Sequence, residues 1–524
     1  MQLKKTSLNW ALKHVERFGD TDIFPLPFEF AAIRAEWSTI LPELEAIDVA
    51  KHQVGDFRRA LTPKSRYGFR LATQLHPIDS LLFSALVYEI AKDLEAHRIA
   101  KGDRRVISHR VKRDENGLLY DPESNFEHFK DVLRAKCDEP EANWVVATDI
   151  ADFYNRLYHH PLKNSLRLAT DKHDHVEAVM NLLGQWNFRV SYGVPVGPAA
   201  TRILAEIAIS DVDHAMLDEE LDFCRFSDDF RIFAPTEREA FRALAILAEY
   251  LQENHGLTLS ERKTDVVPVD RFRQRFLDGD QPRDSARLSD RVGQLLEKHG
   301  REEDQYALLD VDELPDELVA ELDALDLNSV ITEQVVNHRM FDAFAVSIAL
   351  RRLAQLEDPS TLDVVLDNLD YLTPVLPQVV NFLRRVTPIG RRSDVGRKLV
   401  AAVEAGLSSH REYQGIWLLT LFAESDEWNC RDELVRLLAD VTDDVARPML
   451  LQALGVAGHR HWFQRHRRSI QSLGGWQRRA FARGAMCMTD DEYTHWMKSL
   501  LPRLDLLDRA VANHCLNERR SIKT

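Results

Sequence analysis

The sequence predicts an α+β domain over residues 1–280, followed by an all-α domain over residues 281–524. The 524 residues are too many for one hydrophobic core of ordinary size. Short β-type runs alternate with long helical stretches up to about residue 280. From about residue 285 onward only helical periodicity remains, which indicates a second domain without strands.

The composition is that of a folded protein outside the membrane. Hydrophobic residues make up 44% of the chain and charged residues 29%. No apolar run approaches the roughly 20 residues of a membrane span, and charges interrupt the N-terminal segment before a signal-type core could form. Five scattered cysteines without CxxC spacing indicate reduced thiols. We therefore expect a cytoplasmic protein with no membrane partner.

The charge distribution is uneven along the chain. A net charge of -16 argues against general affinity for nucleic acid, which is held largely by Lys and Arg. Basic runs at 101–113, 271–275 and 459–468 are expected to be solvated faces unless nearby chemistry needs them. Residues 301–326 are dominated by Asp and Glu and are expected near the junction of the two domains.

In the first domain, two segments read as long helices and three as short strands. The helical segments are "IDSLLFSALVYEIAKDLEAHR" (78–98) and "AATRILAEIAISDVDHAML" (199–217). The strands are "WVVATDI" (144–150) and the two arms of "FCRFSDDFRIF" (223–233), which read as a hairpin.

In the second domain, successive helices of about 10 to 15 residues are separated by short polar turns. "SDVGRKLVAAVEAGL" (393–407) shows this pattern, with an expected cap at Ser393 or Asp394. Such a succession predicts a helical-repeat array of the HEAT-like type, in which each helix pair buries its apolar face on its neighbours. No strict sequence period is visible, so a compact helical bundle remains an alternative.

The hairpin places two negative charges, Asp228 and Asp229, side by side at its tip. Like charges repel, and neither can be paired within a two-residue turn, so a positive partner is expected there. If the strand that ends in Asp149 pairs beside this hairpin, three carboxylates converge. Such a cluster suits a pair of Mg²⁺ ions, or Mn²⁺ in their place. Adjacent aspartates alone are commonly turn chemistry, so the surrounding motifs decide the interpretation.

Two further segments accompany the acidic strands. "YGVPVGPAATRILAEIAISDVD" (192–213) is a Gly/Pro-rich loop that opens into a helix, and such a loop can present N–H groups to a base pair or phosphate. "HGLTLSERKTDVVP" (255–268) has a Gly turn before a strand. We expect this turn to bring Lys263 toward the acidic strands.

These segments, in order and spacing, resemble motifs A, B, C and D of the palm domain of reverse transcriptases. The matching stretches are "DIADFY", "GVPVGP…TRILAE", "FSDDF" and "GLTLSERKT". Upstream, "RLATQLHPID" is similar to the fingers segment in which an arginine, here Arg70, precedes an aspartate, here Asp79, by nine positions. The resemblance covers roughly residues 60–268, and it implies a fingers and palm domain that polymerises DNA from dNTPs.

The resemblance implies roles for individual residues. It makes Asp149, Asp228 and the backbone carbonyl of Ile150 metal ligands, with Asp229 as the third carboxylate. It gives Lys263 the role of protonating the leaving pyrophosphate; the alternative is a solvated lysine at a strand end.

The resemblance also implies a set of substrate contacts. Tyr154 matches the aromatic steric gate under the sugar; the alternative is a core tyrosine next to Phe153. Arg70 matches the arginine that grips the triphosphate. The further candidate substrate contacts are Lys64, Arg66, Pro195 and Gly197.

Two departures narrow the resemblance. Motif B has Val196 where templated enzymes commonly carry glutamine, and no basic thumb follows motif D. Together with "DIADFYNRLYHH" and the helical C-terminal region, these features resemble the abortive-infection, AbiK-type branch of bacterial defence-associated reverse transcriptases. That branch implies template-independent DNA synthesis in phage defence, single-stranded DNA attached to a protein tyrosine, and closed homo-oligomers.

The sequence does not identify which tyrosine would prime synthesis. Tyr67, Tyr120 and Tyr306 lie in plausible fingers or junction segments, and packing is the alternative role of each. Two other functions are also considered: a conventional RNA-templated reverse transcriptase of a retroelement, and a catalytically silent helical scaffold.

Overall fold

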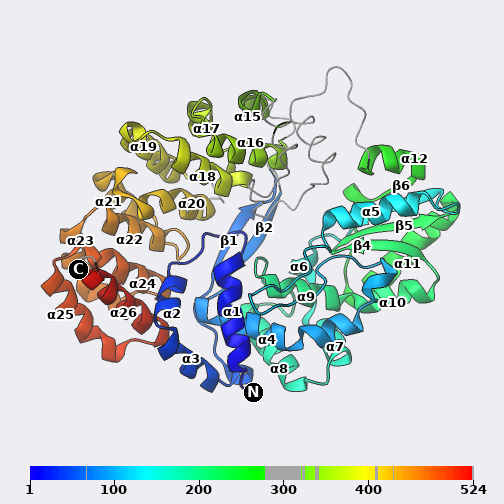
Figure 1. Ribbon diagram of the computed structural model, residues 1–524, viewed down its shortest axis with the longest axis horizontal. Helices are drawn as coiled ribbons and strands as arrows, with labels where there is room; N and C mark the ends of the chain where they lie inside the picture. Colours follow the sequence, from blue (N-terminus) through cyan, green and yellow to red (C-terminus); the bar gives the residue numbers. More distant parts are fainter. Residues whose placement is uncertain are drawn as a thin grey trace.

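The computed structural model describes residues 1–65, 68–277, 320, 325–336, 341–406, 411–428 and 430–521. It has a sheet-containing part, an arc of stacked helices, and a two-stranded hairpin, β1–β2, between them (Figure 1). The strands are β1 (Arg58–Pro63), β2 (Phe69–Gln74), β3 (Trp144–Asp149), β4 (Asp222–Phe226), β5 (Asp229–Ala234) and β6 (Asp265–Pro268). The α-helices up to residue 277 are α1 (Lys5–Phe18), α2 (Glu29–Ala35), α3 (Trp37–Ala46), α4 (Pro77–His97), α5 (Phe126–Cys137), α6 (Phe153–Arg156), α7 (His159–Ala169), α8 (His173–Trp186), α9 (Ala199–Ala208), α10 (Ser210–Asp218), α11 (Glu237–His255) and α12 (Val269–Phe272).

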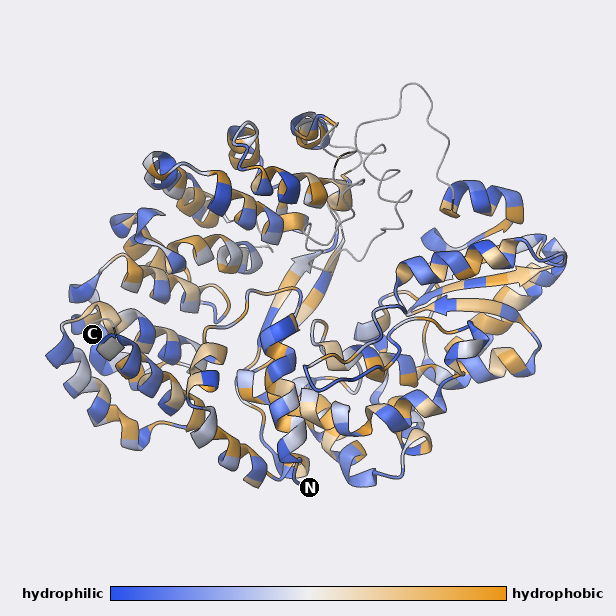
Figure 2. Ribbon diagram, in the orientation of Figure 1, coloured by the Kyte–Doolittle hydropathy of each residue, from blue (hydrophilic) through white to orange (hydrophobic). Residues whose placement is uncertain are grey.

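Four strands form one antiparallel sheet in the order β4-β5-β3-β6. Val146 of β3 joins the core that contains α11, whereas Val145 and Ala147 join a separate core that contains α5. Because both faces of the sheet are covered, β3 is an almost continuous apolar run instead of an alternating one. Figure 2 shows hydrophobic residues along these strands. The predicted strand and hairpin are confirmed, and the strands carry the carboxylates to one end of the sheet.

The predicted helix at 199–217 is wrong in one respect, because the chain breaks there into α9 and α10. Ile209 lies between them with φ of -115°, outside the helical range. The Ser210 hydroxyl donates to the Ile207 carbonyl at 2.9 Å across the break. Serine competes for backbone groups in this way and favours helix ends.

The C-terminal part is a two-layer helical array within the described residues. Its α-helices are α15 (Leu327–Val336), α16 (Ala343–Gln355), α17 (Leu362–Asp367), α18 (Leu376–Val386), α19 (Ile389–Ala405), α20 (Arg411–Glu424), α21 (Arg431–Asp440), α22 (Arg447–Val456), α23 (Arg460–His466), α24 (Gly475–Gly484), α25 (Asp490–Leu500) and α26 (Leu506–Ser521). The even-numbered helices from α16 to α26 pack successively on one another. This succession favours an array over a closed bundle.

The expected cap at Ser393 or Asp394 is wrong. Helix α19 begins at Ile389, directly after Pro388, so both expected caps lie inside it. Pro388 occupies the N-cap position with extended backbone, and the helix begins without a side-chain cap.

The array is joined to the N-terminal segment and to the base of the β1–β2 hairpin. The Arg58 guanidinium lies over the Trp476 ring at 3.7 Å, and the Trp476 indole N–H donates to the Asp56 carbonyl at 2.6 Å. The Trp417 indole N–H donates to the Ile23 carbonyl at 3.1 Å. The C-terminal helices therefore hold the hairpin at its base.

A buried carboxyl at this junction predicts a pH dependence of stability. Burial raises the pKa of Asp20 from 3.8 to about 7, although Gln74 and Arg58 lower it in part. The folded state therefore holds a proton that the unfolded state releases, so this group's contribution to stability falls as pH rises from about 4 to about 7. We expect Asp20→Asn to lose less stability than wild type between pH 5 and pH 8, measured by thermal unfolding. Equal losses in the two proteins would exclude this role for Asp20.

Other predictions concern the whole chain. All five cysteines are free, as expected. Among the described helices, none combines the length and hydropathy needed to cross a bilayer. Arg66, Tyr67, Tyr306, the boundary at residues 280–281 and nearly all of 301–326 lie outside the described residues.

Candidate active site

The structure brings Asp149, Asp228 and Asp229 to the same end of the sheet. Asp149 is the register partner of Asp229 across β3 and β5. The Ile150 N–H donates to the Asp228 carbonyl at 3.0 Å. In extended backbone the N–H and C=O of one residue point to the same side, so the Ile150 carbonyl also faces the hairpin. The arrangement on which the predicted site depends is therefore present.

The positive partners expected at the tip are supplied in part by the protein. Arg231, two residues further along β5, donates to both Asp229 oxygens, at 2.7 Å and 3.0 Å. The Lys263 ammonium lies 2.8 Å from an Asp149 oxygen. Neither aspartate is paired within the turn itself, but Arg231 on the following strand supplies part of the expected positive charge, at Asp229. This bidentate bond between Arg231 and Asp229 was not predicted, although the sequence "DFR" contains both residues two positions apart.

The remaining carboxylate, Asp228, has an altered ionisation. Burial, followed by the charges of Asp149 and Asp229, raises the pKa of Asp228 to about 7, and Lys64 lowers it in part. For Lys263, burial lowers the pKa, but the bond to Asp149 and the three negative charges outweigh it and raise the pKa above its usual range. The site thus has more negative charge near Asp228 than its own cations neutralise.

The donor set fits Mg²⁺ or Mn²⁺, although not as a symmetric trio. Within the described ranges, no three His, Cys, Asp or Glu side chains are grouped so that they could hold one ion together. Asp229 instead lies in the fork of Arg231. Asp149, Asp228 and the Ile150 carbonyl offer only hard oxygen donors, which these ions prefer.

Tyr154 lies beside the hairpin turn. Its hydroxyl is 3.3 Å from the Ser227 hydroxyl, and its backbone carbonyl accepts from the Val194 N–H at 3.0 Å. Burial raises the pKa of Tyr154, and the charge of Asp228 adds to this effect. Its ring also packs against Phe153 at 5.4 Å, so the tyrosine that contacts the core also reaches the carboxylate end.

The fingers residues occupy different positions on the β1–β2 hairpin. Lys64 is exposed at its tip and close enough to affect Asp228. Arg70 is half-buried on β2, opposite Thr62, on the hairpin face that also carries Arg58. Asp79 is buried and accepts from the Gly55 N–H at 2.8 Å. Lys64 lies close enough to Asp228 for its positive charge to lower the pKa of that carboxyl in part.

The motif B loop runs along the hairpin. The Thr73 N–H donates to the Val196 carbonyl at 3.0 Å, and Pro195 is buried. Gly197 has φ of +131°, and a Cβ there would lie 2.5 Å from the Thr21 hydroxyl. Glycine at this position is thus explained by close packing and by backbone conformation.

Sequence reasoning missed a buried charged group beneath the turn. Ser108 and Arg110 are almost completely buried, so the basic run 101–113 is not simply a solvated face. Arg225 and Glu206 are buried beside this run. Charged residues within the apolar stretches "FCRF" and "ILAEIAI" were the available signal.

Comparison with known proteins assigns the sheet-containing part. Residues 96–278 match the family described as reverse transcriptase (RNA-dependent DNA polymerase). The chain carries a reverse-transcriptase domain. No curated protein matches the chain.

Solved structures of telomerase also resemble the chain at low identity. One is telomerase from Candida albicans in complex with the TWJ fragment of telomeric RNA, with 13% identity, 75% of this chain and 71% of that chain covered, and a TM-score of 0.32. Another is apo telomerase from Candida tropicalis, with 12% identity, coverage of 71% and 70%, and a TM-score of 0.32.

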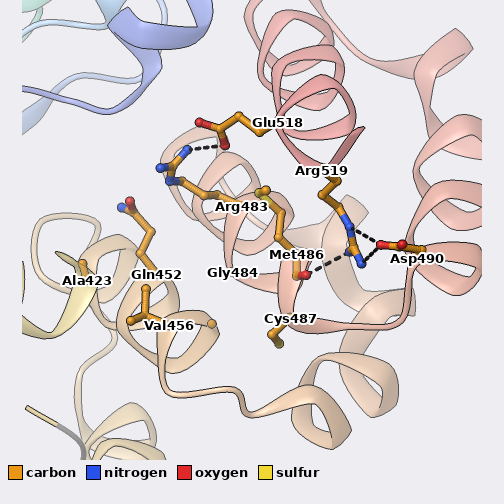
Figure 3. A pocket seen from close by; sticks show the side chains of 11 residues that line it. Ala423, Gln452, Val456, Arg483, Gly484, Met486, Cys487, Asp490, Glu518 and Arg519 are labelled. Atoms are coloured by element: carbon orange, nitrogen blue, oxygen red, sulfur yellow. Dashed lines mark hydrogen bonds and ion pairs between the residues drawn. The ribbon is translucent and has the colours of Figure 1, made fainter. Parts of the chain in front are cut away.

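A pocket of about 540 Å³ lies within the helical array, apart from the reverse-transcriptase domain (Figure 3). Two arginines and two acids line it. Arg483 pairs with Glu518 at 3.4 Å, and Arg519 binds Asp490 at 3.0 Å. Because these charges balance one another, the pocket has no excess charge that would select a ligand.

Proposed function

We propose that this protein is a DNA polymerase that joins dNTPs at the carboxylate end of the β4-β5-β3-β6 sheet. The register of Asp149 with Asp229, together with the bond from Ile150 to Asp228, carries this proposal. Two strands that end side by side bring hard oxygen donors into one place. Nucleotidyl transfer requires such a place for the triphosphate and its metal ions.

The proposed roles follow from the contacts. Asp149, Asp228 and the Ile150 carbonyl would hold two Mg²⁺ ions. When bound, such ions activate the attacking hydroxyl and stabilise the leaving pyrophosphate. Lys263 remains protonated near neutral pH and is the candidate proton donor to that leaving group. Lys64 and Arg70 would bind the triphosphate.

For Tyr154 we propose the steric gate against a 2′-hydroxyl. We expect Tyr154→Val to raise the ratio of rNTP to dNTP incorporation by about 10- to 100-fold, because shape exclusion in a pocket contributes discrimination of this order. The measurement is steady-state incorporation of each nucleotide class. Tyr158→Val is the matched control, since Tyr158 is in the same motif but packs against Tyr192. An unchanged ratio in Tyr154→Val would leave Tyr154 only its packing role.

We further propose protein-primed, template-independent synthesis in bacterial phage defence. Val196 in place of the motif B glutamine and the absence of a basic thumb in the sequence support this specialisation. The protein would act in the cytoplasm as a homo-oligomer. The Tyr120 hydroxyl donates to the Ala199 carbonyl, so this candidate primer is engaged by the fold.

RNA-templated synthesis is the second candidate, because the family that matches residues 96–278 is described as RNA-dependent. One experiment separates the two. Purified protein is incubated with Mg²⁺ and dNTPs, with and without an RNA template, and the product is sequenced. Mass spectrometry after nuclease treatment then tests for DNA attached to a tyrosine. Template-independent, protein-linked product supports the first candidate, and template-matched free product supports the second.

A further inference from the structure

The turn residue Ser227 is held by all three of its polar groups. Its N–H donates to the Ser108 hydroxyl at 2.7 Å. Its carbonyl accepts from an Arg225 Nη at 2.7 Å, and its own hydroxyl lies 3.3 Å from that of Tyr154. Three separate segments therefore converge on the residue immediately before Asp228.

Ser227 also has an unfavourable backbone conformation. Its φ is +56°, in the left-handed region. For a residue with a Cβ this conformation costs about 1 to 2 kcal/mol, and it persists where the surroundings fix it. The contacts from Ser108 and Arg225 provide such surroundings.

The supporting side chains are themselves fixed by buried charge pairs. Glu206, 2% exposed, accepts from the Ser108 hydroxyl and from Arg98 at 2.8 Å. Arg225, 0% exposed, bonds to Glu206 at 3.0 Å and to Asp213 at 2.7 Å. Each charge has an opposite partner, which a buried ionic group requires. Opposite charges paired in this way restrain the side chains that carry them.

We propose that Ser108, oriented by Glu206, acts with Arg225 as a set of positioning residues that holds the Ser227 turn so that the Asp228 carboxylate faces Asp149 for metal binding. This inference rests on the proposed function, because it assigns a purpose to the turn through the metal site. Outer contacts that orient metal ligands commonly contribute a factor of 10 to 100 in metal affinity.

The test measures the affinity for Mn²⁺ alone by electron paramagnetic resonance, together with the melting temperature. We expect Ser108→Ala to weaken Mn²⁺ binding by about 10- to 100-fold. Ser108→Cys, which has nearly the same shape but a weaker hydrogen-bonding group, should fall between Ser108→Ala and wild type. It also provides a second variant if Ser108→Ala does not fold.

Glu29→Gln is the control for the general effect of disturbing a buried ion pair. Glu29 is as buried as Glu206 and is likewise paired with a buried arginine, Arg479, but it lies at the array junction. It should lower the melting temperature and leave Mn²⁺ affinity unchanged. If Ser108→Ala and Ser108→Cys bind Mn²⁺ as wild type does, the positioning inference is overturned while the proposed function stands. If wild type binds no Mn²⁺, the proposed function itself is overturned.

Discussion

Asp228→Asn is expected to reduce dNTP incorporation by about 100- to 1,000-fold, the range seen when one electrostatic contact to the transition state is removed. The amide keeps the shape of the side chain but loses the charge that would bind a metal ion. Among the described residues, no arginine pairs with Asp228 in the way that Arg231 pairs with Asp229, so the Asp228 carboxylate remains available to a metal ion. The rate is measured with purified protein, Mg²⁺ and all four dNTPs.

The control for this prediction is Asp222→Asn on the same hairpin. Asp222 lies at the far end of β4 and pairs with Lys136 at 2.8 Å. The same chemical change there should leave the rate unchanged. Equal activity of Asp228→Asn and wild type would remove Asp228 from catalysis.

Arg479→Met is expected to lower the free energy of unfolding by about 3 to 5 kcal/mol, because its removal leaves the buried Glu29 carboxylate without its paired arginine. Arg479 of α24 is 2% exposed, bonds to Glu29 of α2 at 2.9 Å and faces Asp508 of α26 at 3.4 Å. It joins the N-terminal segment to the array. Burial raises the pKa of Asp508 to about 6, although Arg479 lowers it in part.

Denaturant unfolding measures this effect, with Arg384→Met as the control. Arg384 bonds to both Glu424 oxygens at 2.8 Å, but the pair is about half exposed. Its loss should cost less than about 1 kcal/mol. If both variants lose the same small amount, the junction around Arg479 is not a stabilising contact.

The sequence was sufficient to predict the strand and hairpin that carry the carboxylates. Apolar runs ending in Asp149 and flanking Asp228 specify strands locally, and a two-residue link leaves an antiparallel hairpin as the simple solution. The helices of the array were predictable for the same reason, since their apolar spacing is local. The start of α19 was not predicted because polar residues are the usual sequence signal of a helix start, whereas this helix begins after Pro388 without a side-chain cap.

The contacts beneath the site could not be predicted in the same way. Ser108 and Ser227 are 119 residues apart, and Arg479 reaches Glu29 across 450 residues. Such pairs depend on how elements pack, which neither propensity nor periodicity encodes. The motif match names Arg70 but cannot show that the hairpin tip brings Lys64 close enough to Asp228 to lower the pKa of that carboxyl in part.

The direct test of the metal site is a crystal structure with Mn²⁺ and a non-hydrolysable dNTP, with the ions located by anomalous scattering. We expect anomalous peaks bound by the Asp149 and Asp228 carboxylates and the Ile150 carbonyl, with the triphosphate beside them. A nucleotide bound elsewhere, or no Mn²⁺ at these oxygens under saturating conditions, would contradict polymerisation at this end of the sheet.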